Sequence, residues 1–252
     1  MPPFSQLQAP AQWRTVDFIS DLHLQASEPE TVEAWRRYMA ETPADAVFIL
    51  GDLFEVWVGD DAAAAPGFAA DCATVLRATA ARVALFFMRG NRDFLVGDDY
   101  LQACRVTPLE DPTVLGFGGR RWLLTHGDAL CLADTEYMRF RSQVRTPEWQ
   151  REFLSRPLAE RQAIAADLRE RSTARKNSGV EYADVDSDAA RAWLNAADAQ
   201  VLIHGHTHRP GDHDLRPLGQ RVVLSDWDAR SPPPRQQVLR LTGTGLRRIA
   251  FT

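Results

Sequence analysis

Short apolar runs of strand length recur along the chain, separated by helix-like stretches. Helices are predicted at Glu30 to Ala40 and at Gly67 to Ala80, each between two of these runs. Such alternation is typical of an α/β fold in which helices cover the sheets, and the later runs favour more antiparallel pairing. The predicted strands are Val16 to Ser20, Ala46 to Leu50, Val83 to Met88, Trp122 to Thr125, Val201 to Ile203, Val222 to Ser225 and Val238 to Leu241.

One long region interrupts this alternation. Residues 134–176 carry no strand pattern, only helix-like sequence with scattered apolar side chains, and we interpret residues 134–185 as a helical insertion. The window 134–176 holds ten basic and seven acidic residues, so its net charge is +3 while the rest of the chain carries -8. Taken alone, these features favour solvated helices that pack an apolar face against the core.

Composition limits the class of protein. With 252 residues, of which 45% are hydrophobic and 25% charged, the chain can bury one sizeable core. We expect one domain over residues 13–252, preceded by a flexible extension of residues 1–12. Three widely spaced cysteines argue against a disulfide framework and favour a reducing, cytoplasmic compartment. We see no signal peptide or membrane span, and a net charge of -5 argues against nucleic-acid binding.

Polar side chains with ligand atoms follow five of the predicted strands. Because the carboxyl ends of strands are where α/β proteins build their sites, we expect these segments to meet in space. The glycines among them suit tight turns that expose the neighbouring side chain. The segments are Asp21-Leu22-His23, Gly51-Asp52, Arg89-Gly90-Asn91-Arg92-Asp93, His126-Gly127-Asp128 and His204-Gly205-His206-Thr207-His208.

The last segment contains three of the six histidines in the chain. Carboxylate, amide oxygen and imidazole ligands are typical of sites that bind Mn²⁺, Fe²⁺ or Zn²⁺ for catalysis. A structural zinc site would normally contain cysteine thiolates, and these segments have none. About seven such ligands are too many for one ion with an open position, whereas two ions that share a carboxylate account for them. The histidine segment then supplies one ligand to each ion, and we predict that His204 and His213 are structural.

Five motifs in this order resemble the calcineurin-like metallophosphoesterases: Asp-x-His, Gly-Asp, Gly-Asn-x-Asp, His-Gly-Asp and Gly-His-Thr-His. Each motif is weak alone, but the five together are specific, and the match spans about Val16 to Leu241. The resemblance implies an α/β/β/α sandwich of two mixed sheets. It also implies two sets of metal ligands: Asp21, His23, Asp52 and His208 for one ion, and Asp52, Asn91, His126 and His206 for the other.

One position departs from the broad family, which usually has histidine after the asparagine where this chain has Arg92. Histidine there would protonate an alkoxide leaving group, whereas arginine presents a planar fork of donors to a phosphate. A leaving group that is itself a phosphate needs little protonation. The motif therefore favours a pyrophosphate substrate over a phosphoprotein.

Longer stretches resemble one branch, the UDP-2,3-diacylglucosamine diphosphatases of Gram-negative bacteria: Ser20 to Leu24, Gly51 to Asp61, Gly90 to Leu95 and Ile203 to Pro210. The resemblance implies cleavage of UDP-2,3-diacylglucosamine to UMP and 2,3-diacylglucosamine 1-phosphate in lipid A synthesis, with two Mn²⁺ ions. It implies peripheral binding at the cytoplasmic face of the inner membrane. The helical insertion would form a lid over the acyl chains, with arginines near lipid headgroups. No nucleic-acid or protein partner is expected.

The resemblance also implies a mechanism. We predict that a hydroxide held between two Mn²⁺ ions attacks the α-phosphorus in line, while Asp52 bridges the ions and Arg92 takes up developing charge. The catalytic residues on this hypothesis are Asp52, Asn91, Arg92 and His126. The substrate contacts implied are Asn91, Arg92, His206 and Asp134, together with the lid residues Ser172 and Lys176, where the spacing departs from the family pattern.

Two predictions concern neighbouring side chains. Asp93 and Asp128 are expected to orient Asn91 and His126, with a simple turn role as the alternative. The rim of the pocket is assigned to Glu55, Trp57, Asp60 and Asp61, with Trp57 equally a candidate for the core. Two other functions stay open: another metallophosphoesterase activity, such as a cyclic-nucleotide or nucleotide phosphodiesterase, and a non-catalytic lipid-binding pseudoenzyme.

Overall fold

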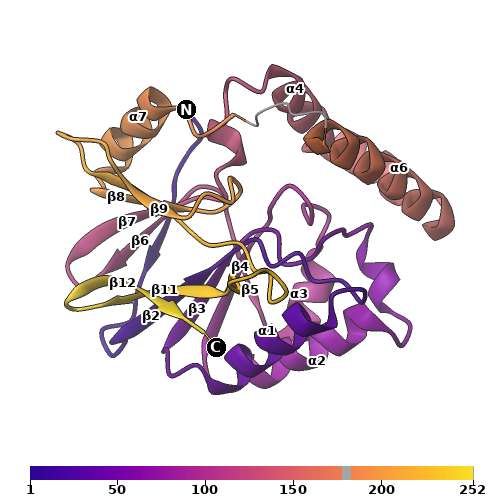
Figure 1. Cartoon of the computed structure of the whole chain (residues 1–252), viewed down its shortest axis with the longest axis horizontal. Helices are drawn as coiled ribbons and strands as arrows, with labels where there is room; N and C mark the ends of the chain where they lie inside the picture. The colour runs from indigo at the N-terminus through magenta and orange to yellow at the C-terminus, as the bar shows by residue number, and fades with distance from the viewer. Residues whose placement is uncertain (178–182, 252) are drawn as a thin grey trace.

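Two six-stranded sheets face each other in the middle of the molecule (Figure 1). The computed structural model describes residues 1–177 and 183–251, except for the side chains of residues 171–177. The first sheet has the strand order β1-β6-β7-β8-β10-β9, and the second has the order β12-β11-β2-β3-β4-β5. Each sheet contains both parallel and antiparallel pairs, so the prediction of two mixed sheets is confirmed.

All seven predicted strands form, within one or two residues of the expected bounds. Strands β1, β5, β6, β9 and β12 lie outside the predicted runs. Antiparallel pairing is concentrated towards the C-terminus, as expected. The strands are β1 (Ser5–Gln8), β2 (Thr15–Ile19), β3 (Ala46–Leu50), β4 (Ala84–Met88), β5 (Thr107–Leu109), β6 (Thr113–Phe117), β7 (Arg120–Leu124), β8 (Val201–His204), β9 (Gly211–Asp214), β10 (Gln220–Val223), β11 (Gln237–Thr242) and β12 (Gly245–Ala250).

Aromatic side chains fill the space between the sheets. Phe18, Phe48 and Phe86 lie side by side on β2, β3 and β4, and the rings of Phe48 and Phe86 stack with their centroids 4.5 Å apart. The alternate residues Val47 and Ile49 of β3 point to the outer face of the same sheet, where they are also buried. Because helices cover that outer face, β3 is apolar at every position.

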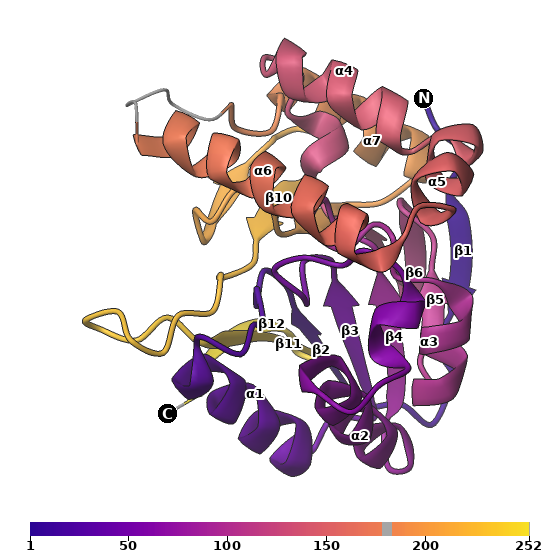
Figure 2. The same ribbon diagram turned by 90° about the vertical axis from the view of Figure 1, so that its right-hand side faces the viewer.

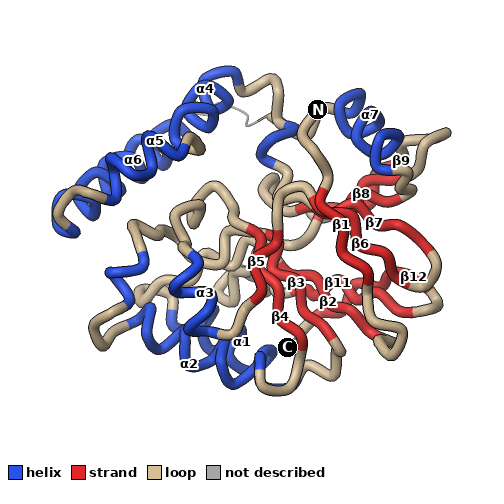
Figure 3. Tube along the Cα trace, turned by 180° about the vertical axis from the view of Figure 1, so that it is seen from behind, coloured by secondary structure: helices blue, strands red, loops and turns tan. Residues whose placement is uncertain are grey.

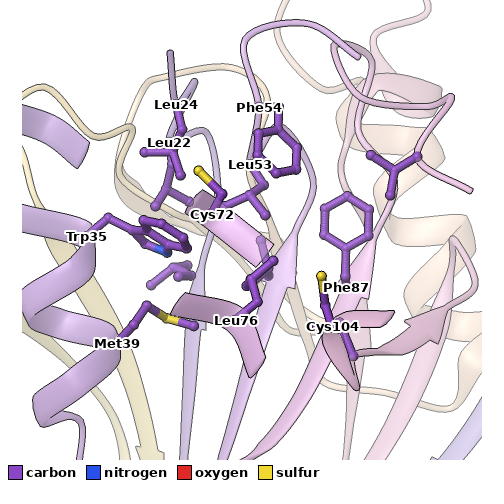
Figure 4. Packing of buried hydrophobic residues seen from close by; sticks show 14 of the residues in the cluster. Leu22, Leu24, Trp35, Met39, Leu53, Phe54, Cys72, Leu76, Phe87 and Cys104 are labelled. Carbon is purple, nitrogen blue, oxygen red and sulfur yellow. The ribbon is translucent and has the colours of Figure 1, made fainter. Parts of the chain in front are cut away.

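Helices cover both outer faces, which gives four layers (Figure 3). Three helices pack on the second sheet, where Trp35, Met39 and Leu76 fill the interface (Figure 4). The first sheet is covered by one helix through Trp193 and Leu194. The α/β/β/α arrangement is therefore confirmed. The covering helices are α1 (Pro29–Glu41), α2 (Phe68–Ala80) and α3 (Asp98–Cys104) on the second sheet, and α7 (Ser187–Ala197) on the first.

The long region without a strand pattern is helical, as predicted: it forms α4 (Thr135–Val144), α5 (Pro147–Leu154) and α6 (Leu158–Asn177). We call these three helices the lid. Figure 2 shows α6 lying across the end of the molecule towards which β3 and β4 point. None of the helices in the described ranges is long and apolar enough to cross a membrane.

The N-terminal segment is not the flexible extension that the sequence indicated. Residues Ser5–Gln8 form β1, which pairs in parallel with β6 from Ser5 opposite Thr113 to Gln8 opposite Gly116. The ring of Phe4 packs edge-on against Trp193 of α7, with centroids 5.9 Å apart. The prediction is wrong for these residues because an edge strand needs few apolar side chains: its partner supplies the backbone hydrogen bonds.

Candidate metal centre

The polar segments that follow the strands meet at the end of the molecule beneath the lid, which confirms the expectation that they converge. Strands β2, β3 and β4 run parallel in one sheet, and β7 and β8 run parallel in the other. Their following segments therefore leave each sheet at one edge. The two edges are joined directly, because the backbone N–H of His206 donates to both carboxylate oxygens of Asp21, at 3.0 and 2.9 Å.

Five of the seven predicted ligands have a left-handed backbone, which is uncommon for residues other than glycine. A residue held in such a conformation costs about 1–3 kcal/mol, and the conformation persists only where the surrounding structure enforces it. Strain gathered in this way is typical of functional sites, where side chains are held ready for a ligand. The φ angles are 54° for Asp21, 48° for His23, 54° for Asp52, 67° for His206 and 53° for His208.

One group of ligand atoms comes from Asp21, His23 and His208, and all three lie within 4.8 Å of one another. Nε2 of His23 is 3.1 Å from Nε2 of His208, which is in turn 3.5 Å from Oδ1 of Asp21. Two imidazole nitrogens that bind one ion at about 2.1 Å each come this close to each other. The three residues therefore fit a divalent metal ion.

A second group lies beside the first. Ligand atoms of Asp21, Asp52 and His126 also lie within 4.8 Å of one another. The Asn91 amide oxygen is 2.9 Å from Nε2 of His126 and 2.8 Å from Nδ1 of His206. The structure thus brings together the four residues predicted for the second ion, and it adds Asp21, which faces both groups.

Asp52 stands between the two groups. Its Oδ2 is 3.9 Å from Nε2 of His23 in the first group, and its Oδ1 is 3.7 Å from Nε2 of His126 in the second. The Asp52 side chain is only 2% exposed. A carboxylate whose two oxygens face different ligand groups has the geometry of a bridging ligand in a two-metal site.

Glycines allow these ligands to pack against neighbouring backbone. A Cβ atom on Gly90 would lie 2.1 Å from Oδ1 of Asp52, and one on Gly205 would lie 2.3 Å from Oδ2 of Asp21. Both separations are far below any normal contact. These two positions therefore need glycine because the carboxylate of a candidate ligand occupies the space of the missing side chain.

The electrostatics of the centre favour bound cations. Burial opposes ionisation of Asp21, but the hydrogen bond and charge of His208 lower its pKa. Burial and the charge of His126 lower the pKa of His206 to about 4, so its imidazole is neutral at physiological pH and free to act as a ligand. Burial opposes protonation of His126, yet Asp52 foremost among the nearby carboxylates raises its pKa to about 9. Buried carboxylates of this kind require compensating positive charge.

Asp93 holds the loops of the centre rather than the side chain predicted for it. This buried carboxylate accepts hydrogen bonds from the backbone N–H groups of Gly90 at 2.8 Å, Leu53 at 2.7 Å and Phe54 at 3.2 Å. It therefore ties the segment after β3 to the segment after β4. The tie holds Gly90, the residue that precedes Asn91.

The predicted partner of His126 is also different. Nδ1 of His126 lies 2.9 Å from the carbonyl oxygen of Leu50, so the backbone of β3 orients the ring. Asp128 instead anchors the lid: its Oδ2 accepts from the hydroxyl of Tyr137 at 2.6 Å and from Nε of Arg141 at 2.8 Å, both on α4. Helix α4 is thus fixed two residues away from a candidate metal ligand.

Helix α6 has two anchors of its own. Arg161, which is 2% exposed, bonds the carbonyl oxygen of Val58 and pairs with the carboxylate of Asp61. Two turns further along the helix, Arg169 pairs with the carboxylate of Glu55. The lid is therefore attached to the loops around the centre from both sides.

A cavity of about 840 Å³ lies between α6 and the segment after β3. Its volume is within the range of ligand pockets, about 300–1,000 Å³. Trp57 lines it while packing against Tyr100, with ring centroids 4.5 Å apart, so this residue serves both the core and the cavity. The charged residues of its lining are Glu55, Arg169 and Glu170, and the apolar residues include Leu24, Phe54, Val56, Val58, Phe68, Ala165 and Ala166.

Two carboxylates behind the histidines were not assigned this position from the sequence. Oε2 of Glu55, expected only at the rim, is 2.7 Å from Nδ1 of His23. Oδ2 of Asp226 is 3.7 Å from Nδ1 of His208 and was not singled out. The available signal was its place directly after the strand run that ends at Ser225, the same relation that Asp21 has to its strand.

The predicted substrate contacts stay predictions. Arg92 is half-buried, and its backbone N–H donates to Oδ1 of Asp52 at 2.8 Å, which fixes the base of its side chain at the centre. Asp134 caps α4 by accepting from the backbone N–H of Tyr137 at 3.1 Å. The side chains of Ser172 and Lys176 lie outside the described residues.

Comparison with known proteins agrees with this geometry. The family model for calcineurin-like phosphoesterases matches residues 14–210. The UDP-2,3-diacylglucosamine hydrolase of Cellvibrio japonicus is 44% identical over 217 residues, covering 83% of this chain and 90% of that protein. The protein of the same name from Stenotrophomonas maltophilia strain K279a is 44% identical over 227 residues, covering 84% of this chain and 91% of that protein. The one from Bordetella pertussis is 41% identical over 235 residues, covering 90% of this chain and 91% of that protein. The chain belongs to the calcineurin-like phosphoesterase family.

Proposed function

We infer that this protein hydrolyses UDP-2,3-diacylglucosamine. The observation that carries the inference is the similarity to hydrolases named for this substrate, which reaches 90% of the chain. A match of that extent cannot leave the three lid helices wholly outside it. It therefore includes at least part of the lid, and a substrate that combines a pyrophosphate with acyl chains would use both the lid and the metal centre.

We further propose that the centre holds two Mn²⁺ ions. Support comes from the two ligand groups, which share Asp21 and have Asp52 between them, and from a donor set of carboxylate, amide and imidazole without thiolate. Two ions bound there would supply an activated water at neutral pH and positive charge for the phosphate oxygens.

The residues of the chain then have distinct tasks at the pyrophosphate. Asp52 and Asn91 fix the two ligand groups relative to each other. Arg92 begins beside the centre and offers its guanidinium fork to a phosphate, so that charge developing on the phosphate leaving group is paired. Attack at the α-phosphorus gives UMP and a sugar 1-phosphate, and the low second pKa of that phosphate makes a protein acid unnecessary.

The cavity beneath α6 supports binding of the acyl chains. Its lining is mostly apolar, and one of its charged residues, Glu55, contacts the candidate metal ligand His23. A lipid held there by its chains would present its headgroup to the centre. The α6 side of the cavity includes the small side chains of Ala165 and Ala166.

The test is hydrolysis of UDP-2,3-diacylglucosamine by metal-stripped protein, with and without added Mn²⁺, in ¹⁸O-water. We expect cleavage that depends on Mn²⁺ and places ¹⁸O in UMP. Label in the sugar phosphate would overturn attack at the α-phosphorus. Cleavage of a simple phosphodiester without cleavage of the lipid would support the proposed metal centre but contradict the proposed substrate.

Asp52→Ala is the matching variant. We expect turnover to fall by more than about 100-fold, the upper figure for residues that only support a metal ligand. Asp71→Asn is the control, because Asp71 is an exposed carboxylate on α2 away from the centre. Equal loss in both variants would mean that the effect is not specific to the centre.

We also propose that the protein acts at the cytoplasmic face of the inner membrane as a peripheral protein. Exposed apolar side chains on the lid support this: Phe140, Leu154 and Leu168 are 37%, 40% and 38% exposed. Cosedimentation with anionic lipid vesicles should weaken when all three are replaced by serine. Unchanged sedimentation would contradict the proposal that the lid makes the contact.

A further inference from the structure

Glu55 stands between a candidate metal ligand and the lid. Its Oε2 lies 2.7 Å from Nδ1 of His23, and its Oε1 pairs with Nη1 of Arg169 on α6. Arg169 also donates to the backbone carbonyl oxygen of Glu55, at 3.3 Å. The Glu55 side chain is 12% exposed. One largely buried carboxylate thus touches the metal centre with one oxygen and the lid with the other.

The position of Glu55 suits a residue that orients a metal ligand. Nε2 of His23 faces His208 and Asp52, so Nδ1 is the nitrogen left over. Nδ1 is buried, and Oε2 of Glu55 lies within hydrogen-bonding distance of it, although the N–H does not point directly at that oxygen. Metal-binding histidines commonly give this second nitrogen to a carboxylate, which fixes the tautomer and the ring.

Arg169 extends this contact to the position of α6. It lies one helical turn from Ala165, and both residues line the cavity beneath α6. The other lid anchors end elsewhere: Arg161 reaches Val58 and Asp61. Movement of α6 away from the cavity would therefore separate Arg169 from Glu55.

We propose that Glu55 is a positioning residue that couples the seating of α6 to the metal affinity of the group containing His23. Arg169 holds the carboxylate of Glu55, and that carboxylate holds the ring of His23. When α6 is seated over the cavity, the His23 group binds a divalent ion more tightly. By thermodynamic reciprocity, a bound ion favours the seated lid to the same extent. The inference rests on the proposed metal centre.

Four variants separate the steps. Glu55→Ala removes both contacts and should weaken Mn²⁺ binding at one of two sites by about 10- to 100-fold, the usual effect of losing such a partner. Glu55→Gln keeps an acceptor for Nδ1 but no charge for Arg169, so its loss should be smaller. Arg169→Gln should weaken binding by about fivefold, a typical coupling between sites. The double variant Glu55→Ala/Arg169→Gln should match Glu55→Ala, because Arg169 acts through Glu55.

The measurement is titration of metal-stripped protein with Mn²⁺, with free Mn²⁺ followed by its paramagnetic resonance signal. Arg156→Gln is the matched control, because Arg156 is a lid arginine that pairs with Glu152 and Glu160 inside the lid. The unfolding midpoint of each variant in chelator identifies those that fold. If Glu55→Ala does not fold, Glu55→Gln and Arg169→Gln carry the test.

The outcomes are distinct. If the wild-type protein binds no divalent ion, the proposed function itself is contradicted. Wild-type binding with unchanged affinity in Glu55→Ala would overturn the positioning role alone. If Arg169→Gln raises KM while its Mn²⁺ affinity equals that of the control, Arg169 only secures the lid or the substrate, and the coupling is rejected.

Discussion

Replacing Gly90 by alanine tests whether backbone packing places the carboxylate of Asp52, the candidate bridging ligand. Gly90 is buried between the loops of the centre, and its backbone does not require the left-handed conformation, so alanine brings no conformational strain of its own. The new Cβ atom would lie 2.1 Å from Oδ1 and 2.4 Å from the backbone nitrogen of Asp52. The effect of the variant therefore comes from displacement of Asp52.

The size of the displacement follows from these contacts. Separations below 3.0 Å are essentially never seen for a Cβ atom, so Oδ1 of Asp52 must move from 2.1 Å to at least that distance, by about 0.9 Å. Misplacing a catalytic group by about 1 Å can cost about 100-fold in rate, which is about 2.7 kcal/mol in the barrier. Overpacking should also lower the free energy of unfolding by about 1–3 kcal/mol.

The assay compares Gly90→Ala with Gly243→Ala. A Cβ atom on Gly243 meets nothing within 4 Å, and its backbone also avoids the left-handed region, so only Gly90→Ala should lose activity. We would measure kcat/KM for UDP-2,3-diacylglucosamine and Mn²⁺ affinity, both well below the unfolding temperature of either variant. If the two variants share the wild-type values, the close approach of Gly90 to Asp52 does not position the ligand, and the reasoning is refuted.

Three further predictions concern stability. Arg240→Leu removes the donor to both oxygens of the fully buried Asp17, at 2.7 and 2.8 Å, and should cost about 3–5 kcal/mol of unfolding free energy in urea titration; a loss below about 1 kcal/mol would contradict it. Asp186→Ala removes the side-chain cap of α7 and should cost about 1 kcal/mol, whereas an unchanged urea midpoint would show that the cap is dispensable. The hydrogen bond from Arg221 lowers the pKa of Asp184 to about 2. The stabilisation that this ion pair gives the folded protein is therefore complete above pH about 4 and is lost as the pH falls towards 2. Between these pH values, the Tm of Asp184→Asn should fall less than the Tm of the wild-type protein.

The sequence predicts the central strands within one or two residues, and it predicts which side chains gather at the candidate centre; both results have a local cause. A run such as Ala46 to Leu50 is apolar at every position because both faces of β3 are covered, and that pattern is legible without coordinates. The ligands follow such runs directly. Since parallel strands end at one edge, the order of motifs was enough to predict that Asp21, Asp52 and His206 meet.

Edge elements were harder to predict. Strand β9 alternates between half-buried and exposed residues and contains only polar side chains after Gly211, so it has no hydrophobic period to detect. Strand β1 has the same burial pattern. Such strands form because a neighbouring strand has unpaired backbone N–H and C=O groups, and these groups are in place only once the sheet is assembled.

The partners behind the ligands were decided by the tertiary structure alone. Asp128 follows His126 by two residues, yet its carboxylate accepts a hydrogen bond from Tyr137 on the lid helix α4. The imidazole of His126 contacts a carbonyl oxygen of β3 instead. Glu55 lies 32 positions from His23 in the sequence, yet its carboxylate contacts the ring of His23 because the loops after β2 and β3 lie side by side. Sequence spacing determines which residues follow each strand, but the angle between layers and the placement of the lid determine which polar atoms come within hydrogen-bonding distance.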